Sequence, residues 1–301
     1  MRTILLIRLS LRKVKKIDRT HSVYPLYSCI FALLKQSYNS MKQILDMKVI
    51  ANERLHPNYC LLKLASEKRL PEIFPGQFVE VRVDNSPTTF LRRPISIHDV
   101  HEERNEIDLL IQLVGDGTRK IAEACPGDTL NILLPLGNGF TLPTSQENPD
   151  MRLLLVGGGV GCAPLLYLGA RLRENGFKPS FLIGARSKND LLRLDAFSRL
   201  GEIFITTEDG SEGEKGYVTN HSILCGKSFD RIYTCGPKPM MMAVARYAAK
   251  QGVDCEVSLE NRMACGLGAC LCCVEKDREG HNVCVCKEGP VFNINQLSWL
   301  S

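Results

Sequence analysis

The chain has 301 residues, of which 44% are hydrophobic and 24% are charged. This length is enough for two or three hydrophobic cores, and no apolar run approaches the roughly 20 residues that a membrane-spanning helix requires. The net charge of +5 comes from residues 1–40, which hold eight Lys or Arg and one acid, so the remainder of the chain is slightly acidic. We therefore expect a soluble multidomain protein and exclude nucleic acid and the membrane as partners.

Residues 1–40 form an extension that differs from the rest of the chain. Short apolar runs at 1–10 and 24–34 flank the cationic segment Arg12–Arg19. This composition is compatible with a targeting or membrane-surface arm, with a disordered tail, or with upstream codons translated from a wrong start. Because a strand-like pattern begins directly after Met41, we favour the wrong start.

Residues 41–148 predict an antiparallel β-barrel. Short segments rich in Val, Ile and Leu are separated by turn residues such as Pro-Gly and Gly-Asp, and their even spacing is typical of a barrel. The expected strands are Asp46–Asn52, Tyr59–Ala65, Gln77–Val83, Ile107–Val114 and Thr129–Leu134.

Residues 149–254 predict an α/β domain. The continuous apolar strand Met151–Val156 is followed by a glycine turn, and Ala163–Asn175 has helical spacing. Alternating strands and helices indicate an open parallel sheet covered by helices. The next expected strands are Ser180–Gly184, Glu202–Thr207 and Arg231–Cys235. The fold class is thus multidomain α+β.

Residues 255–301 hold seven of the 13 cysteines. Cys265, Cys270 and Cys273 follow the spacing C-x4-C-x2-C, and twelve residues separate Cys273 from Cys286. This is the plant-type [2Fe-2S] pattern, in which each iron takes two thiolates, and it predicts a small cluster-binding domain that carries electrons singly. We expect a reducing cytoplasm rather than disulfides, because no convincing secretory signal precedes these cysteines.

Two other metal sites compete with this interpretation. Cys270, Cys273, Cys284 and Cys286 together could form a four-thiolate zinc knot, although zinc usually takes two separated knuckles rather than three ligands on one loop. A Rieske centre needs two histidines, and His281 stands alone in this region. The spacing therefore favours the [2Fe-2S] cluster.

Two barrel motifs suit a flavin nucleotide. They are Leu91–Ser96, with the letters LRRPIS, and Gly115–Thr118, with the letters GDGT. A guanidinium binds phosphate oxygens bidentately, and the amides of Gly117 and Thr118 with the Thr118 hydroxyl complete an anion site where a helix begins. Taken alone, an Arg-Arg-Pro run is more often a solvated turn and Gly-Asp-Gly a hairpin tip.

The α/β domain carries two candidate nicotinamide motifs. Gly157, Gly159 and Gly161 form a strand-to-helix turn suited to a pyrophosphate, although Cys162 occupies the place of the third Rossmann glycine. The alternative is a tight turn without a ligand. The second motif follows the expected strand Arg231–Cys235 and suits a nicotinamide ring; it comprises Cys235, Gly236 and Pro237. Cys235 alone is typical of a small buried hydrophobic residue.

The choice between NAD and NADP rests on two opposing signals. Glu208 and Asp209 follow a predicted strand, where carboxylates repel a 2′-phosphate, whereas Arg186 after the preceding strand argues for NADP. We expect NAD.

Together these motifs resemble the ferredoxin reductase superfamily and, within it, the electron transfer subunits of dihydroorotate dehydrogenase B. The resemblance covers the chain from Met41 to its carboxy terminus. The residues that carry it are Leu91–Ser96, Gly117–Thr118, Gly157–Pro164, Cys235–Pro237, Glu260–Cys270 and Cys286–Phe292.

The resemblance implies binding residues for two groups. FAD would be held by Arg93, Pro94, Ile95, Ser96, Leu110, Ile111, Gln112, Gly117 and Thr118. The cluster would be held by Cys265, Cys270, Cys273 and Cys286, leaving Cys272 and Cys284 as non-ligands, with Cys284 the alternative to Cys286. Ile95 stands where many superfamily members have Tyr. Cys265 stands where related sulfide or ferredoxin:NADP oxidoreductases tend to have Asp.

The implied activity is an electron relay in pyrimidine (UMP) biosynthesis. An FMN-containing dihydroorotate dehydrogenase catalytic subunit would be the partner, in a heterotetramer of two of each chain, and electrons would pass through [2Fe-2S] and FAD to NAD+. We expect no catalytic acid–base residues on this chain. The alternatives are a related reductase subunit serving a sulfide, hydrogenase or glutamate-synthase-like partner, and a zinc-stabilised interaction module.

Overall fold

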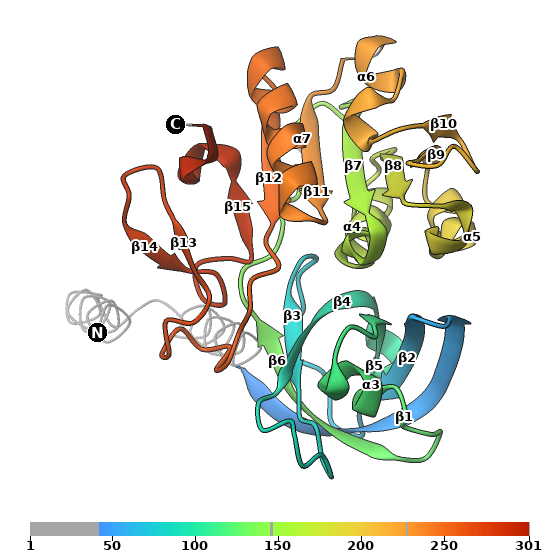
Figure 1. Ribbon diagram of the computed structural model, residues 1–301, viewed down its shortest axis with the longest axis vertical. Helices are drawn as coiled ribbons and strands as arrows, with labels where there is room; N and C mark the ends of the chain where they lie inside the picture. Colours follow the sequence, from blue (N-terminus) through green and yellow to red (C-terminus); the bar gives the residue numbers. More distant parts are fainter. Residues whose placement is uncertain (1–41, 145–146, 227, 301) are drawn as a thin grey trace, which may run out of the picture. The chain divides into compact units, whose positions relative to one another are not determined.

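The computed structural model describes residues 42–144, 147–226 and 228–300 (Figure 1). The expectations for residues 1–40 and Met41 fall outside this range. Within it, no helix is both long enough and apolar enough to span a membrane.

Six antiparallel strands close into a barrel in the order β1-β2-β5-β4-β3-β6. The short helix α3 (Asp116–Ile121) follows β5. The barrel strands are β1 (Gln43–His56), β2 (Tyr59–Ala65), β3 (Phe78–Val81), β4 (Arg93–His101), β5 (Glu106–Gln112) and β6 (Thr129–Leu136). Their inward side chains form a buried core of Val, Leu and Ile, as the alternating strand pattern predicts. The expected barrel is confirmed.

Strand β4 was not among the expected strands. It contains the Arg-Pro-Ile-Ser motif, which reads locally as a turn, yet Ile95 and Ile97 alternate into the barrel core and are almost fully buried. Pro94 lies opposite Glu80 in the register of β3 and β4. Burial of the two isoleucines therefore outweighs the turn tendency of the preceding residues.

The second part of the chain is a seven-stranded sheet in the order β10-β9-β8-β7-β11-β12-β15. All neighbouring strands are parallel except β15, which runs antiparallel to β12. The strands are β7 (Leu153–Gly158), β8 (Ser180–Ala185), β9 (Glu202–Thr207), β10 (Glu214–Lys215), β11 (Arg231–Cys235), β12 (Asp254–Ser258) and β15 (Val291–Asn293). The expected parallel sheet is confirmed and gains an antiparallel edge.

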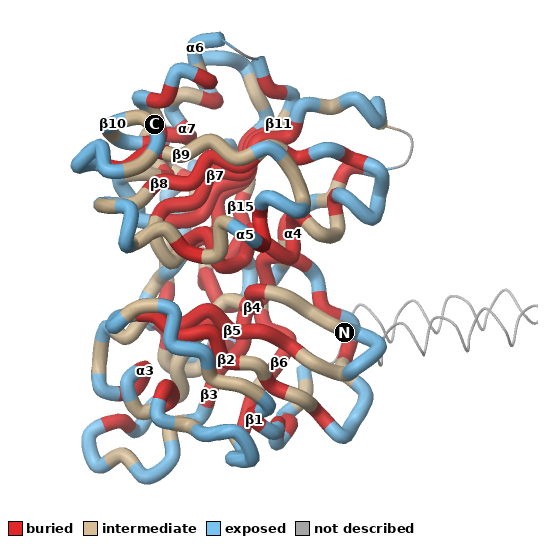
Figure 2. Tube along the Cα trace, turned by 90° about the vertical axis from the view of Figure 1, so that its right-hand side faces the viewer, coloured by how far each residue is buried: buried red, intermediate tan, exposed pale blue. Residues whose placement is uncertain are grey.

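Helices cover both faces of this sheet. Leu155 of β7 packs with helices α4 (Ala163–Glu174) and α5 (Leu194–Ser198) on one face. Leu154, its neighbour, packs with α7 (Lys238–Gln251) on the other face, where α6 (Ile223–Gly226) also lies. Figure 2 shows the resulting burial along the central strands. Alternation along β7 thus supplies both layers of the core.

The cysteine-rich segment lies between two strands of the sheet. It leaves β12, forms the hairpin of β13 (Val274–Lys276) and β14 (Asn282–Cys284), and returns through β15. Cys273 and Cys286 are buried in the same core as α7. The domain limits 41–148, 149–254 and 255–301 stay predictions; the last boundary falls at the start of β12.

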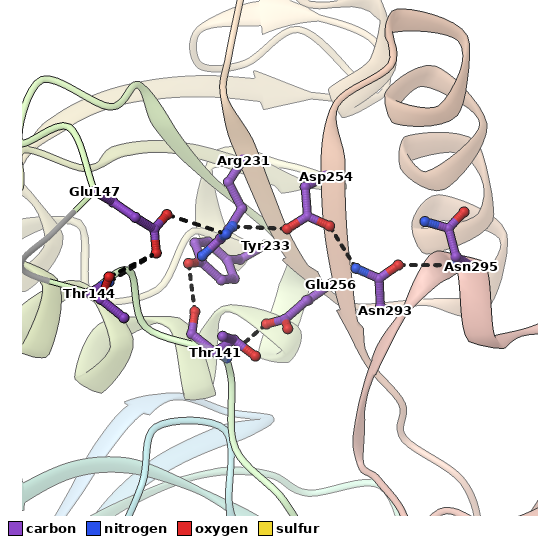
Figure 3. A network of polar contacts seen from close by, with 9 residues as sticks. All are labelled: Thr141, Thr144, Glu147, Arg231, Tyr233, Asp254, Glu256, Asn293 and Asn295. Carbon is purple, nitrogen blue, oxygen red and sulfur yellow. Dashed lines mark hydrogen bonds and ion pairs between the residues drawn. The ribbon is translucent and has the colours of Figure 1, made fainter.

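A polar network ties the connection between barrel and sheet to three strands (Figure 3). The Tyr233 hydroxyl donates to the Thr141 carbonyl at 2.8 Å, and the Thr141 amide donates to Glu256 Oε2 at 2.9 Å. Arg231 Nε lies 2.9 Å from Asp254 Oδ2, and Asn293 Nδ2 donates to Asp254 Oδ1 at 2.6 Å. Strands β11, β12 and β15 are thereby linked to one another and to the segment that enters the sheet.

Candidate functional site

A cleft of about 240 Å³ is lined by four parts of the chain. The barrel contributes from β3, β4, β5 and α3, and the glycine turn and the start of α4 contribute Val160 and Ala163. The end of β12 and the residues after it contribute Ser258 to Asn261 and Met263, and Pro290 lies just before β15. Six of the residues expected to bind FAD line this cleft: Pro94, Ile95, Ser96, Leu110, Gln112 and Thr118. The barrel motifs and the α/β domain therefore face one common space.

Ile111 is placed differently from its neighbours. Strand alternation turns Leu110 and Gln112 toward the cleft and Ile111 into the barrel core, where it is fully buried. Only the Ile111 backbone is left to contact a ligand. Gln112 is held in place by its Nε2, which donates to the Tyr59 hydroxyl at 3.0 Å.

A second hollow of about 190 Å³ shares Val114 and Thr118 with the first. Arg93 and Gly117 meet in this hollow: a Cβ on Gly117 would lie 2.5 Å from Arg93 Nε. The guanidinium is held by hydrogen bonds from Arg93 Nη1 to the Leu91 and Arg92 carbonyls, each 3.1 Å. Because Gly117 has no side chain, the Arg93 side chain can lie directly against this turn.

The Thr118 hydroxyl closes the turn before α3. It accepts from the amides of Val114 and Gly115 at 3.1 and 3.2 Å and donates to the Gly115 carbonyl at 3.1 Å. The hydroxyl therefore makes hydrogen bonds within its own turn, in addition to the anion contact expected from the sequence.

An apolar cleft that continues into a hollow with a guanidinium fits an elongated ligand such as FAD, which has a flat ring at one end and phosphates farther along.

The two nicotinamide motifs lie against each other. The glycine turn forms the 3₁₀ segment Gly159–Cys162, and a Cβ on Gly161 would lie 2.4 Å from the Gly236 Cα. Gly159 has a φ of 55° and no atom within 4 Å of the position a Cβ would take. Gly161 therefore allows the two turns to pack closely, and Gly159 leaves open space for a ligand.

Cys235 and Glu260 form a pair that the sequence did not identify. Cys235 Sγ donates to Glu260 Oε1 at 3.8 Å, and Glu260 lines the cleft. Burial raises the pKa of Cys235 well above its usual value, and desolvation also raises the pKa of Glu260. Cys235 therefore stays a thiol, a donor beside the cleft. The signal for Glu260 was its place at the start of the Glu260–Cys270 motif.

The cysteine loop directs backbone amides at sulfur. Cys265 Sγ accepts from the amides of Leu267 and Ala269, each at 3.4 Å, and Cys286 Sγ accepts from the Gly268 amide at 3.1 Å. Gly266 and Gly268 have φ values of 64° and 78°, a backbone that glycine adopts freely. Amides aimed at sulfur are the environment that a thiolate-bound iron–sulfur cluster needs.

The four expected ligands are arranged as two neighbouring pairs. Burial raises the pKa of Cys265, but amide bonds and the Cys270 side chain outweigh it and lower that pKa to about 6. Burial and the adjacent Cys273 raise the pKa of Cys286 to about 12. Among the described residues no three His, Cys, Asp or Glu side chains are gathered as a ready ion site. Bound iron would hold all four as thiolates.

Cys284 differs from Cys286 in its contacts. Its Sγ lies 4.0 Å from the Gly268 carbonyl, as a weak donor rather than an acceptor of amide bonds. Cys272 is exposed. None of the twelve cysteines that the structure describes forms a disulfide.

Comparisons with known proteins agree with this geometry. Residues 260–298 match the family described as the iron-sulfur cluster binding domain of dihydroorotate dehydrogenase B, and residues 155–246 match the oxidoreductase NAD-binding domain. The chain is 40% identical over 227 residues to the dihydroorotate dehydrogenase B (NAD(+)) electron transfer subunit of Shouchella clausii, over 74% of this chain and 86% of that protein. The chain belongs to the family of dihydroorotate dehydrogenase B electron transfer subunits.

A second relative matches over nearly its whole length. The subunit from Bacillus mycoides is 37% identical over 262 residues, which is 85% of this chain and 99% of that protein. Because the matched carboxy-terminal domain is an iron–sulfur one, the cluster is favoured over the zinc knot.

Solved structures show the same fold. A chain of the NADH-dependent reduced ferredoxin-NADP oxidoreductase structure has a TM-score of 0.75 and 28% identity, over 84% of this chain and 90% of that chain. The ferredoxin NADP+ reductase of Neisseria gonorrhoeae, with bound FAD and NADP, has a TM-score of 0.59 and 17% identity, over 69% and 92%. The ferredoxin reductase-like architecture is thereby confirmed.

Proposed function

We propose that this chain transfers electrons from a dihydroorotate-oxidising catalytic subunit to NAD+. The observation that carries the proposal is the cleft in which the barrel motif, the glycine turn and the segment leading to the cysteine loop meet. Such a meeting point lets a flavin face both a nicotinamide and a one-electron carrier. The reaction serves pyrimidine (UMP) biosynthesis.

The bound groups supply the redox chemistry: FAD exchanges two electrons with nicotinamide, and a [2Fe-2S] cluster passes electrons one at a time. The chain's residues bind and orient. Arg93 and Gly117 form the phosphate-binding hollow, and the side chains of Leu110 and Gln112 line the ring cleft. Cys235 keeps its proton beside the cleft, so the nicotinamide end stays free of an added negative charge.

NAD is the proposed nicotinamide nucleotide. Asp209 accepts from the Ser211 amide and hydroxyl at 2.9 and 2.6 Å, and these bonds lower the pKa of Asp209. An ionised carboxylate beside the expected ribose position repels a 2′-phosphate. Thr207 and Glu212 fix the same loop, because Thr207 Oγ1 donates to the Glu212 carbonyl at 2.8 Å.

The proposed partner is an FMN-containing dihydroorotate dehydrogenase catalytic subunit, in a heterotetramer of two of each chain. The general base for dihydroorotate then lies on that subunit. A reducing cytoplasm is the proposed location, supported by the free thiols of the described cysteines.

The test mixes the anaerobically prepared chain with this catalytic subunit from the same cell and follows dihydroorotate-dependent NADH formation. We expect NADH formation that disappears in Cys270→Ser. A flavinated chain that oxidises NADH or NADPH with artificial acceptors, but never couples to dihydroorotate, would instead favour a reductase subunit with another partner. The 28% identity to the NADH-dependent ferredoxin-NADP oxidoreductase chain makes that the alternative to examine.

A further inference from the structure

Glu80 is a buried carboxyl on the outer face of the barrel. Strand alternation turns Val79 and Val81 into the barrel core, whereas Phe78 and Glu80 point outward. Phe78 lines the cleft, and Pro94 of the expected flavin motif is the register partner of Glu80. Although it faces outward, Glu80 has 0% exposure, so another part of the chain covers it.

The covering part is the cysteine loop. A Cβ on Gly266 would lie 2.9 Å from Glu80 Cγ and 3.2 Å from Glu80 Oε1. Gly266 also has a positive φ of 64°. The carboxyl therefore packs against the backbone of the residue that follows the expected ligand Cys265. Glu80 stands between the strand pair that faces the cleft and the loop that is expected to hold the cluster.

The Glu80 carboxyl has no hydrogen-bond partner. Both Oε1 and Oε2 are buried without one among the described residues. The nearest cation, Arg92, uses Nη1 to donate to the Glu80 carbonyl at 3.1 Å and to the Asn131 carbonyl at 3.0 Å, and Nη2 to donate to Asn131 Oδ1 at 2.5 Å. Arg92 thus lies close enough to offset the charge in part, but its three hydrogen bonds go to other acceptors than the Glu80 carboxyl.

A buried carboxyl without a hydrogen-bond partner costs stability, so its presence in the folded chain calls for an explanation. A negative charge in a region of low dielectric favours the less negative, oxidised state of a nearby redox centre. Charge near an iron–sulfur cluster is one of the terms that set its reduction potential. The Glu80 carboxylate has the position for such an effect on both centres, and lies nearer the cysteine loop.

We propose that Glu80 is a positioning residue of the relay, whose carboxylate lowers the reduction potential of the cluster in the adjacent loop and so favours electron flow onward to the flavin. The inference rests on the proposed function. According to this inference, a residue of the barrel lowers the reduction potential of the cluster, since Glu80 belongs to β3 and not to the cysteine-rich segment.

The test is an anaerobic redox titration of the complete holoenzyme, monitored by the electron paramagnetic resonance signal of the reduced cluster. Burial, offset in part by Arg92, raises the pKa of Glu80 to about 7, so the titration is run well above that pH. We expect Glu80→Gln to raise the reduced-to-oxidised ratio of the cluster about tenfold at a fixed potential, which is about 59 mV for one electron. The flavin potential is expected to shift less.

Three variants make the outcome decisive. Glu80→Asp keeps the charge and is expected to stay near the wild-type potential, whereas Glu80→Met removes it with a different shape and is expected to shift in the same direction as Glu80→Gln. Glu279→Gln removes an exposed carboxylate of the cysteine-rich segment, where solvent screens the effect, and serves as the control. An intact cluster signal with an unchanged potential in both neutral variants would overturn the proposal. Absence of the cluster signal from the wild type would instead overturn the proposed function.

Discussion

Gly161 and Gly236 lie so close that a Cβ on Gly161 would stand 2.4 Å from the Gly236 Cα and 2.6 Å from the Cys235 carbonyl oxygen. The first belongs to the turn after β7 and the second to the turn after β11, two neighbouring parallel strands. Both expected nicotinamide motifs thus form one continuous backbone surface at the carboxyl ends of these strands, which is where ligands of open α/β sheets bind.

Gly161→Ala is expected to separate the two turns and weaken NADH binding. The added methyl meets backbone atoms, which cannot rotate away, so we expect a loss of stability of about 1–3 kcal/mol and a Kd for NADH raised at least tenfold. Isothermal calorimetry and urea unfolding measure the two effects. Gly226→Ala is the control, because nothing lies within 4 Å of its Cβ position. Unchanged NADH affinity in Gly161→Ala would count against this binding surface.

Arg93→Met is expected to weaken FAD binding without unfolding the barrel. The guanidinium lines the hollow beside Gly117, and loss of a charge-assisted contact of about 1.5–3 kcal/mol raises Kd roughly 10- to 100-fold. Flavin content after dialysis and fluorescence titration of the apoprotein measure the change. Arg82→Met removes an exposed arginine that pairs with Asp84 and should leave flavin content unchanged. Equal flavin loss in both variants would argue against a specific role for Arg93.

Sequence patterns predicted elements best where local signals agree with the fold. The expected strands Tyr59–Ala65 and Arg231–Cys235 match β2 and β11 residue for residue. The sequence does not predict strand β4, because the two arginines and the proline before its buried isoleucines are typical of a turn. Helix α7 was not expected either, although it supplies much of one face of the core.

The site could be predicted only as far as its motifs reach along the chain. The resemblance implies Leu110, Ile111 and Gln112 together and does not separate the two side chains that face the cleft from Ile111, which faces the barrel core. Glu80 belongs to no recognisable motif, and Glu260 begins the Glu260–Cys270 motif without a spacing that would indicate its pairing with Cys235. Their contacts, with Gly266 and Cys235, join segments far apart in sequence and exist only after folding.

His98 is expected to make stability depend on pH. It is fully buried on β4, and its Nδ1 lies 2.8 Å from the Ala163 carbonyl at the start of α4, so Nδ1–H donates. Burial lowers its pKa from 6.5 to about 4, because desolvation disfavours the charged imidazolium. The unfolded chain binds a proton below about pH 6.5 and the folded chain does not until pH 4. The free energy of unfolding therefore falls by about 3 kcal/mol as the pH decreases from 6.5 to 4, and above pH 6.5 this loss is absent.

The check compares wild type with His98→Gln in urea unfolding from pH 7 to pH 4. The wild type should lose more stability over this interval than the variant, which has no group titrating at that position. A difference between the two proteins that stays constant with pH would show that His98 is not the titrating group.

Cys286→Ser and Cys284→Ser are expected to differ in iron content, although the two residues are only two positions apart. Cys286 Sγ accepts the Gly268 amide at 3.1 Å and lies beside Cys273, as an iron ligand should, whereas Cys284 Sγ faces the Gly268 carbonyl. Iron and sulfide analysis of anaerobically purified protein should find the cluster retained in Cys284→Ser and lost or strongly reduced in Cys286→Ser. Far-ultraviolet circular dichroism checks that both variants fold. The reverse pattern would make Cys284 the fourth ligand, and retention in both variants would show that either cysteine can complete the ligand set when the other is removed.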